Sequence, residues 1–205
     1  SGQALGDEPA TKVALGDLDG DGDLDALAAD GAEGARIWPN EGAGLFGSVR
    51  LLSASNARDL ALGDLNGDGA LDVMLGISMG YEVWLNDGRG TFASSGSVIG
   101  PNATKSVALG DVDGDYDLDA FLLRGEEVRV LANDGRGAFT DTGQVIRSWM
   151  ATQAAVGDLD NDGDLDIYVT GGVDHLLWRN DGSGRFAQYG SFHEASYWQV
   201  ALGDL

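Results

Sequence analysis

Short apolar runs alternate with loops rich in Gly and Asp along all 205 residues of the chain. One kind of run ends in Gly-Asp, as in residues 13–17, and a second kind, such as residues 73–75, has no polar face. A strand that is buried on both faces has the second pattern. A third run ends at an Asn-Asp-Gly or Asn-Glu-Gly turn, which is typical of a β-hairpin. A fourth run begins at an aromatic residue, namely Phe46, Phe92, Phe139 or Phe186.

The four runs recur as one unit. The lead aspartates of the units are spaced by 47, 47, 47 and 46 residues, at Asp17, Asp64, Asp111, Asp158 and Asp204. Four antiparallel strands in roughly 40–50 residues are typical of one blade of a β-propeller, and a solenoid is the weaker alternative. The sequence therefore predicts an all-β fold: a β-propeller of four-stranded antiparallel blades, with four full repeats of about 47 residues and partial repeats at both ends.

The register of the repeat also divides the chain. Residues 1–10 align with the end of a repeat, so we expect them to form the outer strand of a preceding blade. The chain is then either a fragment of a longer propeller or a protomer that neighbouring chains complete. The expected division is 1–10 for the outer strand, 11–57, 58–104, 105–151 and 152–197 for blades one to four, and 198–205 for the first strand of a further, incomplete blade.

The composition limits the classes of partner. The 34 Asp and Glu residues outnumber the 12 Lys and Arg residues, which gives a formal charge of −22. Such a charge repels phosphate backbones and anionic membranes, so we expect no nucleic-acid partner. No apolar stretch reaches the ~20 residues that a membrane span needs. Hydrophobic residues make up 43% of the chain, enough for a packed core, and without Cys no disulfide framework indicates a redox compartment.

More than half of the acidic residues stand in four nine-residue segments, here called the acidic loops: residues 17–25, 64–72, 111–119 and 158–166. Acidic or amide side chains recur at their first, third, fifth and ninth positions. Two carboxylates ~4 Å apart repel by roughly 4 kcal/mol at an effective dielectric near 20, so a cation is needed where several converge. Asp and Gly also form ordinary solvated turns. Ordinary solvated turns do not explain why the same spacing occurs in four loops. Ligands that are all oxygen, on a flexible loop, favour Ca²⁺ over other cations.

Residues 16–25 (GDLDGDGDLD) and 84–92 (WLNDGRGTF) carry a resemblance to a known family. The pattern resembles the FG-GAP repeat, also called the VCBS-type repeat, of integrin-α-like β-propellers, and covers nearly the whole chain. The resemblance implies about four calcium sites, one per full repeat, held by side chains one, three, five and nine and by the seventh carbonyl. The implied side-chain ligands are Asp17, Asp19, Asp21, Asp25, Asp64, Asn66, Asp68, Asp72, Asp111, Asp113, Asp115, Asp119, Asp158, Asp160, Asp162 and Asp166, and the seventh-position residues are Asp23, Ala70, Asp117 and Asp164.

The third acidic loop departs from the family pattern at its sixth position. Tyr116 stands where the other loops have Gly22, Gly69 and Gly163. If that position requires a positive φ, Tyr strains the loop, because a side chain beyond glycine disfavours this region.

The expected function is that of a calcium-stabilised extracellular or cell-surface module for adhesion, interaction or structural assembly, including polymerisation through the incomplete end blades. Extracellular modules often bind calcium in the 10⁻⁴–10⁻³ M range, where cytosolic calcium would leave the sites empty. The sequence contains no catalytic motif, so we expect no enzymatic activity. The alternatives are a lectin and, less favoured, an accessory domain of a secreted enzyme.

The partner is expected to be a protein or a glycan. In integrin-like propellers the face formed by the linkers between blades binds ligands. The candidate contacts are therefore aromatic and basic residues of these linkers. They are Arg58, Lys105, Trp149, Tyr197 and Trp198, and capping of the core is the alternative role for them.

Overall fold

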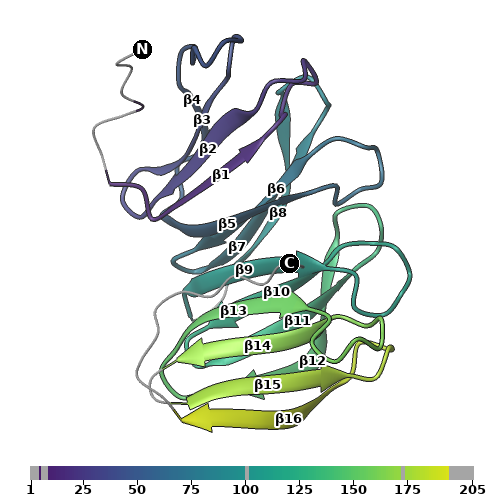
Figure 1. Cartoon of the computed structure of the whole chain (residues 1–205). Helices are drawn as coiled ribbons and strands as arrows, with labels where there is room; N and C mark the ends of the chain where they lie inside the picture. Colours follow the sequence, from purple (N-terminus) through teal and green to yellow (C-terminus); the bar gives the residue numbers. More distant parts are fainter. Residues whose placement is uncertain (1–4, 6–8, 100–101, 172–173, 194–205) are drawn as a thin grey trace. The chain divides into compact units, whose positions relative to one another are not determined.

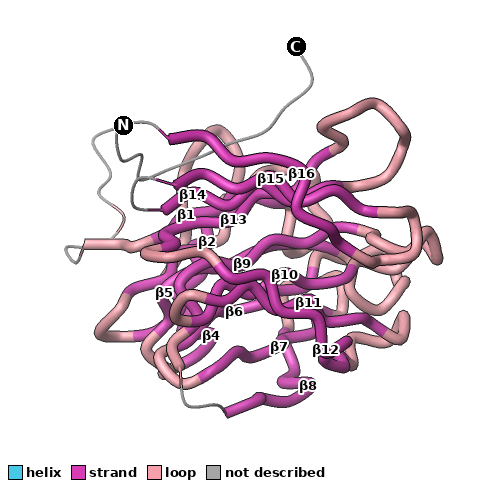
Figure 2. The backbone as a smooth tube through the Cα atoms, turned by 90° about the horizontal axis from the view of Figure 1, so that it is seen from below, coloured by secondary structure: helices cyan, strands magenta, loops and turns pink. Residues whose placement is uncertain are grey.

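The structure is a computed structural model that describes residues 5, 9–99, 102–171 and 174–193. Every regular element in these residues is a β-strand, and Figure 2 shows strands joined by loops. A helix that is long and apolar enough to cross a membrane does not occur in this part of the chain. The expected outer strand at 1–10 and trailing strand at 198–205 fall outside the described residues, apart from positions 5, 9 and 10.

The chain divides into two compact units, Ser1–Thr104 and Lys105–Leu205. The strands from β1 to β8 form two sheets and those from β9 to β16 form two more, each in chain order (Figure 1). The first two sheets consist of β1 (Lys12–Gly16), β2 (Asp25–Asp30), β3 (Gly34–Trp38) and β4 (Arg50–Ser53), then β5 (Ala57–Gly63), β6 (Asp72–Ile77), β7 (Gly80–Asn86) and β8 (Phe92–Ile99). The other two consist of β9 (Thr104–Gly110), β10 (Asp119–Arg124), β11 (Glu127–Asn133) and β12 (Phe139–Arg147), then β13 (Ala151–Gly157), β14 (Asp166–Gly171), β15 (Asp174–Asn180) and β16 (Phe186–His193).

The predicted all-β fold is confirmed, since the four sheets are four-stranded, antiparallel and consistent with the blades of a β-propeller. Three of the four outer strands begin at the predicted phenylalanine. The first repeat differs, because β4 begins at Arg50 and Phe46 pairs with Asn40 in an isolated bridge outside the strand. Pro39, which directly follows β3, supplies the reason: proline has no N–H to donate to a neighbouring strand.

Each unit has its own apolar core, built where one sheet faces the next. In the first unit β5 lies against β1 and β2, and Leu27 of β2 packs with Leu60 of β5. In the second unit β10 lies against β13, and Phe121 packs with Ile167. The strands that follow the acidic loops, β6 for example, are buried on both faces, as the unbroken apolar runs predict.

The glycines that end β1 and β9 allow this close packing. A Cβ atom on Gly16 would lie 2.7 Å from Cδ1 of Leu71, and one on Gly110 would lie 2.6 Å from Cδ1 of Leu165. Each of these leucines occupies the eighth position of the acidic loop in the following repeat. The Gly-Asp pair therefore combines two functions: the glycine admits the neighbouring sheet, and the aspartate begins the loop.

Candidate metal centre

The four acidic loops join the first strand of each sheet to the second, so β1, β5, β9 and β13 lead into them. The first position of each loop follows the last strand residue directly, and the ninth position is the first residue of the next strand. That residue is Asp25, Asp72, Asp119 or Asp166. The strands thus fix both ends of each loop, and the second to seventh positions between them form successive bends.

The first aspartate of each loop folds the loop around its own carboxylate. Asp17 accepts hydrogen bonds from the N–H groups of Gly20 at 2.8 Å and Gly22 at 3.0 Å. The same bonds recur from Gly67 and Gly69 to Asp64, from Gly114 and Tyr116 to Asp111, and from Gly163 to Asp158. Such Asx turns are why Asp is favoured where a chain reverses repeatedly.

The fifth position contributes a second turn of this kind. Asp21 Oδ1 accepts a hydrogen bond from the N–H of Asp23 at 2.9 Å. The corresponding bonds link Asp68 with Ala70, Asp115 with Asp117 and Asp162 with Asp164. One oxygen of each fifth-position carboxylate is therefore used to shape the loop.

The ninth aspartate is buried in every loop and joins the loop to the third strand. Asp25 accepts hydrogen bonds from the N–H of Leu18 at 2.9 Å and from the N–H of Asn40 at 2.6 Å. The same pair of bonds reaches Asp72 from Leu65 and Asn86, Asp119 from Val112 and Asn133, and Asp166 from Leu159 and Asn180. Burial raises the pKa of Asp72 and raises that of Asp119 to about 6.

Three of the four loops gather carboxylates closely enough to hold a metal ion. One oxygen from each residue of a group lies within 4.8 Å of the others in the sets Asp17, Asp19 and Asp25; Asp111, Asp113 and Asp115; and Asp158, Asp160 and Asp166. In two of these groups a buried oxygen has no hydrogen-bond partner, namely Oδ1 of Asp19 and Oδ1 of Asp160. Burial and the neighbouring charges of Asp25 and Asp21 raise the pKa of Asp19. Three close carboxylates, one of them with a buried unpaired oxygen, fit a hard divalent cation.

The second loop differs because an amide replaces one carboxylate. Asn66 Nδ2 donates a hydrogen bond to Asp68 Oδ2 at 3.0 Å, and Asn66 Oδ1 accepts one from the N–H of Asp68. No group of three acidic side chains meets within 4.8 Å in this described loop. An amide oxygen is still a ligand for a hard cation, so the donor set remains all oxygen.

The third and first loops differ in how the predicted ligands are arranged. In the third loop the ninth-position Asp119 stands outside the close group, whereas Asp25 belongs to the group of the first loop. Tyr116 has a φ of 72°, beside 91° for Gly22. The sixth position therefore adopts a positive φ, as the loop pattern suggests. The seventh-position side chains of Asp23, Asp117 and Asp164 stand outside all three groups.

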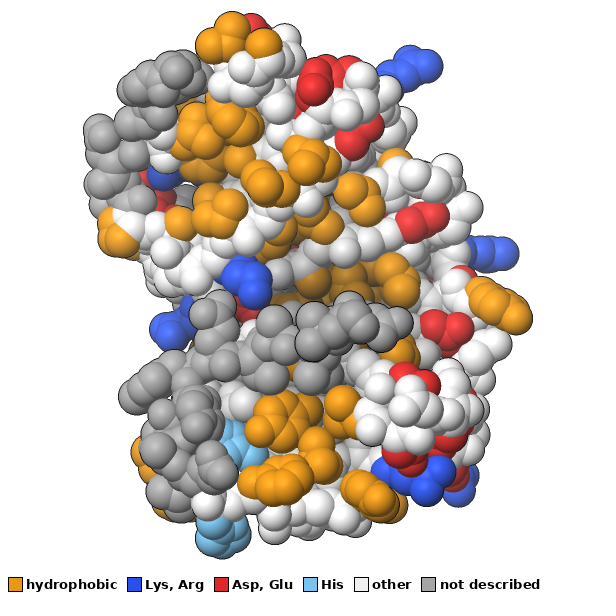
Figure 3. Space-filling view, in the orientation of Figure 1, with side chains coloured by type: hydrophobic (Ala, Val, Ile, Leu, Met, Phe, Trp, Pro, Cys, Tyr) orange, Lys and Arg blue, Asp and Glu red, His pale blue; other side chains and the backbone are white. Residues whose placement is uncertain are grey.

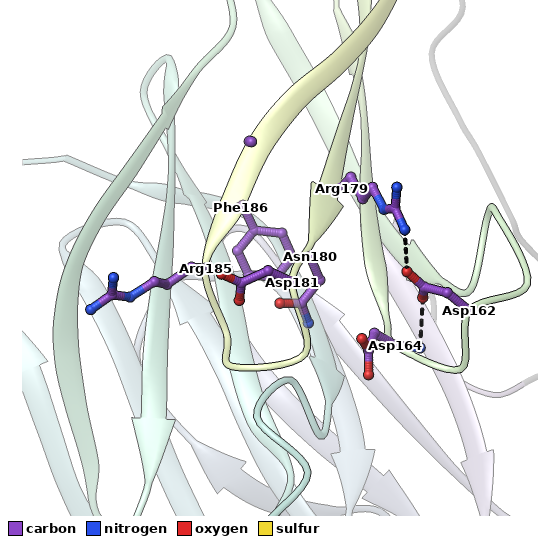
Figure 4. A pocket seen from close by; sticks show the side chains of 8 residues that line it. Asp162, Asp164, Arg179, Asn180, Asp181, Arg185 and Phe186 are labelled. Carbon is purple, nitrogen blue, oxygen red and sulfur yellow. Dashed lines mark hydrogen bonds and ion pairs between the residues drawn. The ribbon is translucent and has the colours of Figure 1, made fainter.

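Arg179 of β15 places a cation beside the fourth loop, and the sequence analysis did not predict this contact. The guanidinium group of Arg179 forms ion pairs from Nε to Asp160 Oδ2 and from Nη2 to Asp162 Oδ2, both at 2.7 Å. Figure 4 shows the second of these contacts. The hydrogen bond from Arg179 holds the pKa of Asp162 below its usual value. Alignment of the repeats could have indicated this contact. The residue before the asparagine of the Asn-Asp-Gly or Asn-Glu-Gly turn, here called the turn asparagine, is basic in the fourth repeat, whereas it is Pro39, Leu85 or Ala132 in the other three.

The candidate contacts in the linkers are less completely placed. Trp149 is 70% exposed and lies between β12 and β13, next to Met150, which has a φ of 57°. Arg58 and Lys105 are exposed, and Lys105 Nζ donates a hydrogen bond to the carbonyl of Ala151 at 3.2 Å. Tyr197 and Trp198 lie outside the described residues.

The repeated sheets and the repeated Asp-rich loops define an all-β repeat protein of the β-propeller class. The sequence profile of the FG-GAP-like repeat matches residues 17–75, 64–122 and 111–169. The chain belongs to this family of FG-GAP-like repeat proteins. A search of curated proteins found no match.

The solved structures that are similar to the chain include a lectin and a protein solved with its partner. A lectin from Agrocybe aegerita, described with its specific recognition of non-reducing terminal N-acetylglucosamine, is 25% identical, with a TM-score of 0.65 over 89% of this chain and 52% of the lectin. BBS1N, solved in complex with ARL6DN, is 15% identical, with a TM-score of 0.63 over 88% of this chain and 55% of its own. The chain thus spans about half the length of both structures.

Proposed function

We propose that the chain is a calcium-stabilised β-propeller module that serves interaction or adhesion outside the cell and has no catalytic activity. The observation that carries the metal assignment is the pair of buried, unpartnered oxygens, Oδ1 of Asp19 and Oδ1 of Asp160, each within a group of three close carboxylates. Such atoms are destabilising unless a cation neutralises them. The donor set is all oxygen, which favours calcium among the common divalent ions.

The side chains of positions one, three, five and nine would hold the ion, with the carbonyl of position seven completing the set. The bound ion would supply positive charge that removes the repulsion among these carboxylates. At a calcium concentration tenfold above the Kd, each occupied site adds about 1.4 kcal/mol to the free energy of unfolding. Four sites would then contribute about 6 kcal/mol, which is comparable with the net stability of a domain.

The location outside the cell rests on calcium supply. Sites on flexible loops in extracellular modules commonly bind calcium with a Kd of about 10⁻⁴–10⁻³ M. A module that depends on such sites folds stably where calcium is abundant. The membership of the FG-GAP-like repeat family supports this proposal.

Calcium removal tests the metal assignment. We expect the melting temperature to rise by roughly 10–20 °C between chelator and saturating calcium, because about 6 kcal/mol is added to a chain of this size. Asp19→Ala should lose about a quarter of this gain, yet it should melt no lower than the wild type in chelator, because it removes repulsion. Differential scanning calorimetry in both buffers measures the two effects.

A matched control separates ligand loss from charge loss. Glu126 is an exposed acid outside the acidic loops. Glu126→Gln removes the same charge as Asp19→Ala and should leave the calcium-dependent gain unchanged. A melting temperature that is independent of calcium would show that the loops are ordinary solvated turns.

A specific observation favours a lectin as the second candidate. Trp149 is 70% exposed in a loop between sheets, and aromatic rings of this kind stack on sugar faces. The similar lectin structure recognises non-reducing terminal N-acetylglucosamine, which supports a glycan as one class of partner. The similar BBS1N structure contains a protein partner, which supports the other class.

Self-assembly is a third candidate function, and exposed apolar side chains on the first sheet support it. Val13 and Leu15 of β1 are 55% and 58% exposed, and Leu51 of β4 is 62% exposed. Figure 3 shows hydrophobic side chains gathered over the sheet of β1 to β4. A further blade, from another copy or from another part of a longer protein, would bury such a surface.

Partner binding distinguishes these forms. If the module is a lectin, a glycan array should show binding that Trp149→Ala reduces at least tenfold, since stacking on one ring typically contributes over 1 kcal/mol. Tyr189→Ala removes another exposed aromatic, on β16, and should leave glycan binding unchanged. An array without binding would argue against the lectin, and a monomer in light scattering would argue against self-assembly.

A further inference from the structure

Arg179 occupies a position that differs in each repeat. It directly precedes the turn asparagine Asn180 at the end of β15, where the first three repeats have Pro39, Leu85 and Ala132. A side chain at this position lies beside the acidic loop of its own sheet, because the asparagine that follows is bonded to the ninth aspartate of that loop. Only the fourth repeat therefore places a basic side chain at this point of the repeat.

The contacts of Arg179 are directed at predicted metal ligands. Its Nε and Nη2 atoms lie 2.7 Å from Oδ2 of Asp160 and Oδ2 of Asp162, which are the third and fifth positions of the loop. Figure 4 shows the guanidinium group turned toward Asp162, whereas Arg185, across the same cavity, points away from the loop. The guanidinium group therefore uses carboxylate oxygens that a bound ion would need.

A guanidinium group suits this role for two physical reasons. It stays charged at any pH the protein meets, and its planar fork can pair with two acceptors at once. The side chain of Arg179 is also 47% exposed, so water can replace its contacts and the group can leave the loop. Meanwhile Asp160 Oδ1 has no hydrogen-bond partner, so the loop retains an oxygen for a second cation.

We propose that Arg179 is a tethered cation that occupies the fourth acidic loop when calcium is scarce and competes with calcium for its third and fifth carboxylates. This inference rests on the proposed calcium binding. The fourth loop then binds calcium more weakly than the first and third loops, and it fills after them as the calcium concentration rises. In return, it keeps its fold without metal, since part of the repulsion among its carboxylates is already neutralised.

Replacing Arg179 by the residue of another repeat tests the proposal. Arg179→Leu copies Leu85 of the second repeat. In calorimetric titration of the whole chain, one class of calcium sites should gain affinity by about tenfold, the change expected when a two-point ion pair no longer competes. In chelator the same variant should melt at a lower temperature than the wild type, because the fourth loop has lost its internal cation.

Two further variants serve as controls. Arg185→Leu removes an exposed arginine that lines the same cavity, and it should leave the titration unchanged if only the contact with the loop matters. Ala132→Arg installs the basic side chain beside the third loop, where the third and fifth positions are Asp113 and Asp115. It should weaken one class of sites by about tenfold, in the direction opposite to Arg179→Leu.

The outcomes separate the two proposals. If calcium binds and Arg179→Leu changes neither the affinities nor the melting temperature in chelator, the arginine is a surface ion pair only and the inference is wrong. If Arg179→Leu and Arg185→Leu have equal effects, the cause is general charge and the inference is also wrong. If no loop of the wild type or of Arg179→Leu binds calcium, the proposed function itself is wrong.

Discussion

Tyr116 holds a backbone conformation that its residue type disfavours. Its φ is 72°, and the other three loops have glycine at the same position, with φ values between 87° and 97°. The left-handed region costs a residue with a side chain roughly 1–2 kcal/mol. Its side chain is 94% exposed, so packing does not offset this strain.

Tyr116→Gly should therefore stabilise the protein. Relief of strain exceeds the entropy that glycine adds to the unfolded chain, which leaves a net gain of about 0.5–1 kcal/mol. Urea denaturation in chelator measures this without a contribution from metal. As a control, Tyr189→Gly replaces another exposed tyrosine, in β16 and without a positive φ, and it should lower stability. Equal effects of the two variants would contradict the strain argument.

The turn asparagines join neighbouring elements, and their hydrogen bonds differ by position in the chain. Asn86 Nδ2 donates to the carbonyl of Leu71 in its own loop at 3.1 Å and to that of Leu18 in the preceding loop at 2.8 Å. Asn180 makes the same two bonds, to Leu165 and Val112. Asn40, in the first described sheet, donates to Leu24 of its own loop.

Asn86→Ala should thus cost more stability than Asn40→Ala. The first variant leaves the carbonyls of Leu18 and Leu71 without their donor, and the bond to Leu18 is buried. We therefore expect the free energy of unfolding to fall by roughly 2–3 kcal/mol. The second removes one exposed bond to a carbonyl, and about 1 kcal/mol is expected. Chemical denaturation of both variants gives the difference. Equal losses would show that the bond to the preceding loop contributes nothing.

The strands show where a sequence pattern is sufficient and where it fails. Runs such as residues 73–75 predict buried second strands because both of their faces are apolar, and the structure has β6 there. The outer strand of the first repeat does not begin at Phe46, because Pro39, seven residues earlier, has no N–H to donate to the neighbouring strand. Likewise, the role of Arg179 depends on a side chain that reaches across to Asp160, and periodicity within one loop does not reveal such contacts.

The net charge of the molecule is a property of its loops. Of the 34 acidic residues 18 stand in the four acidic loops, and four calcium ions would reduce the formal charge of −22 to about −14. The sequence shows acidic or amide side chains at the first, third, fifth and ninth positions, and the family resemblance implies that all four are ligands. The structure brings three of them together in each of three loops: the first, third and ninth in the first and fourth loops, and the first, third and fifth in the third loop. The carboxylates that come within 4.8 Å of one another differ between loops because single residues differ. In the second loop, for example, Asn66 carries an amide in place of a carboxylate.

The bonds of Leu18 and Val112 link the first and the third acidic loop to the sheet of the following repeat. The N–H of Leu18 is held by Asp25 of its own loop and its carbonyl by Asn86 of the next repeat; Val112 is held in the same way by Asp119 and Asn180. An ion that orders one loop therefore also orders the turn beside the next one. If the loops bind calcium as proposed, the first ion lowers the ordering entropy that the second site of a linked pair must lose. We therefore expect occupation of one loop to raise the calcium affinity of the linked loop, even where that loop is the weaker of the two.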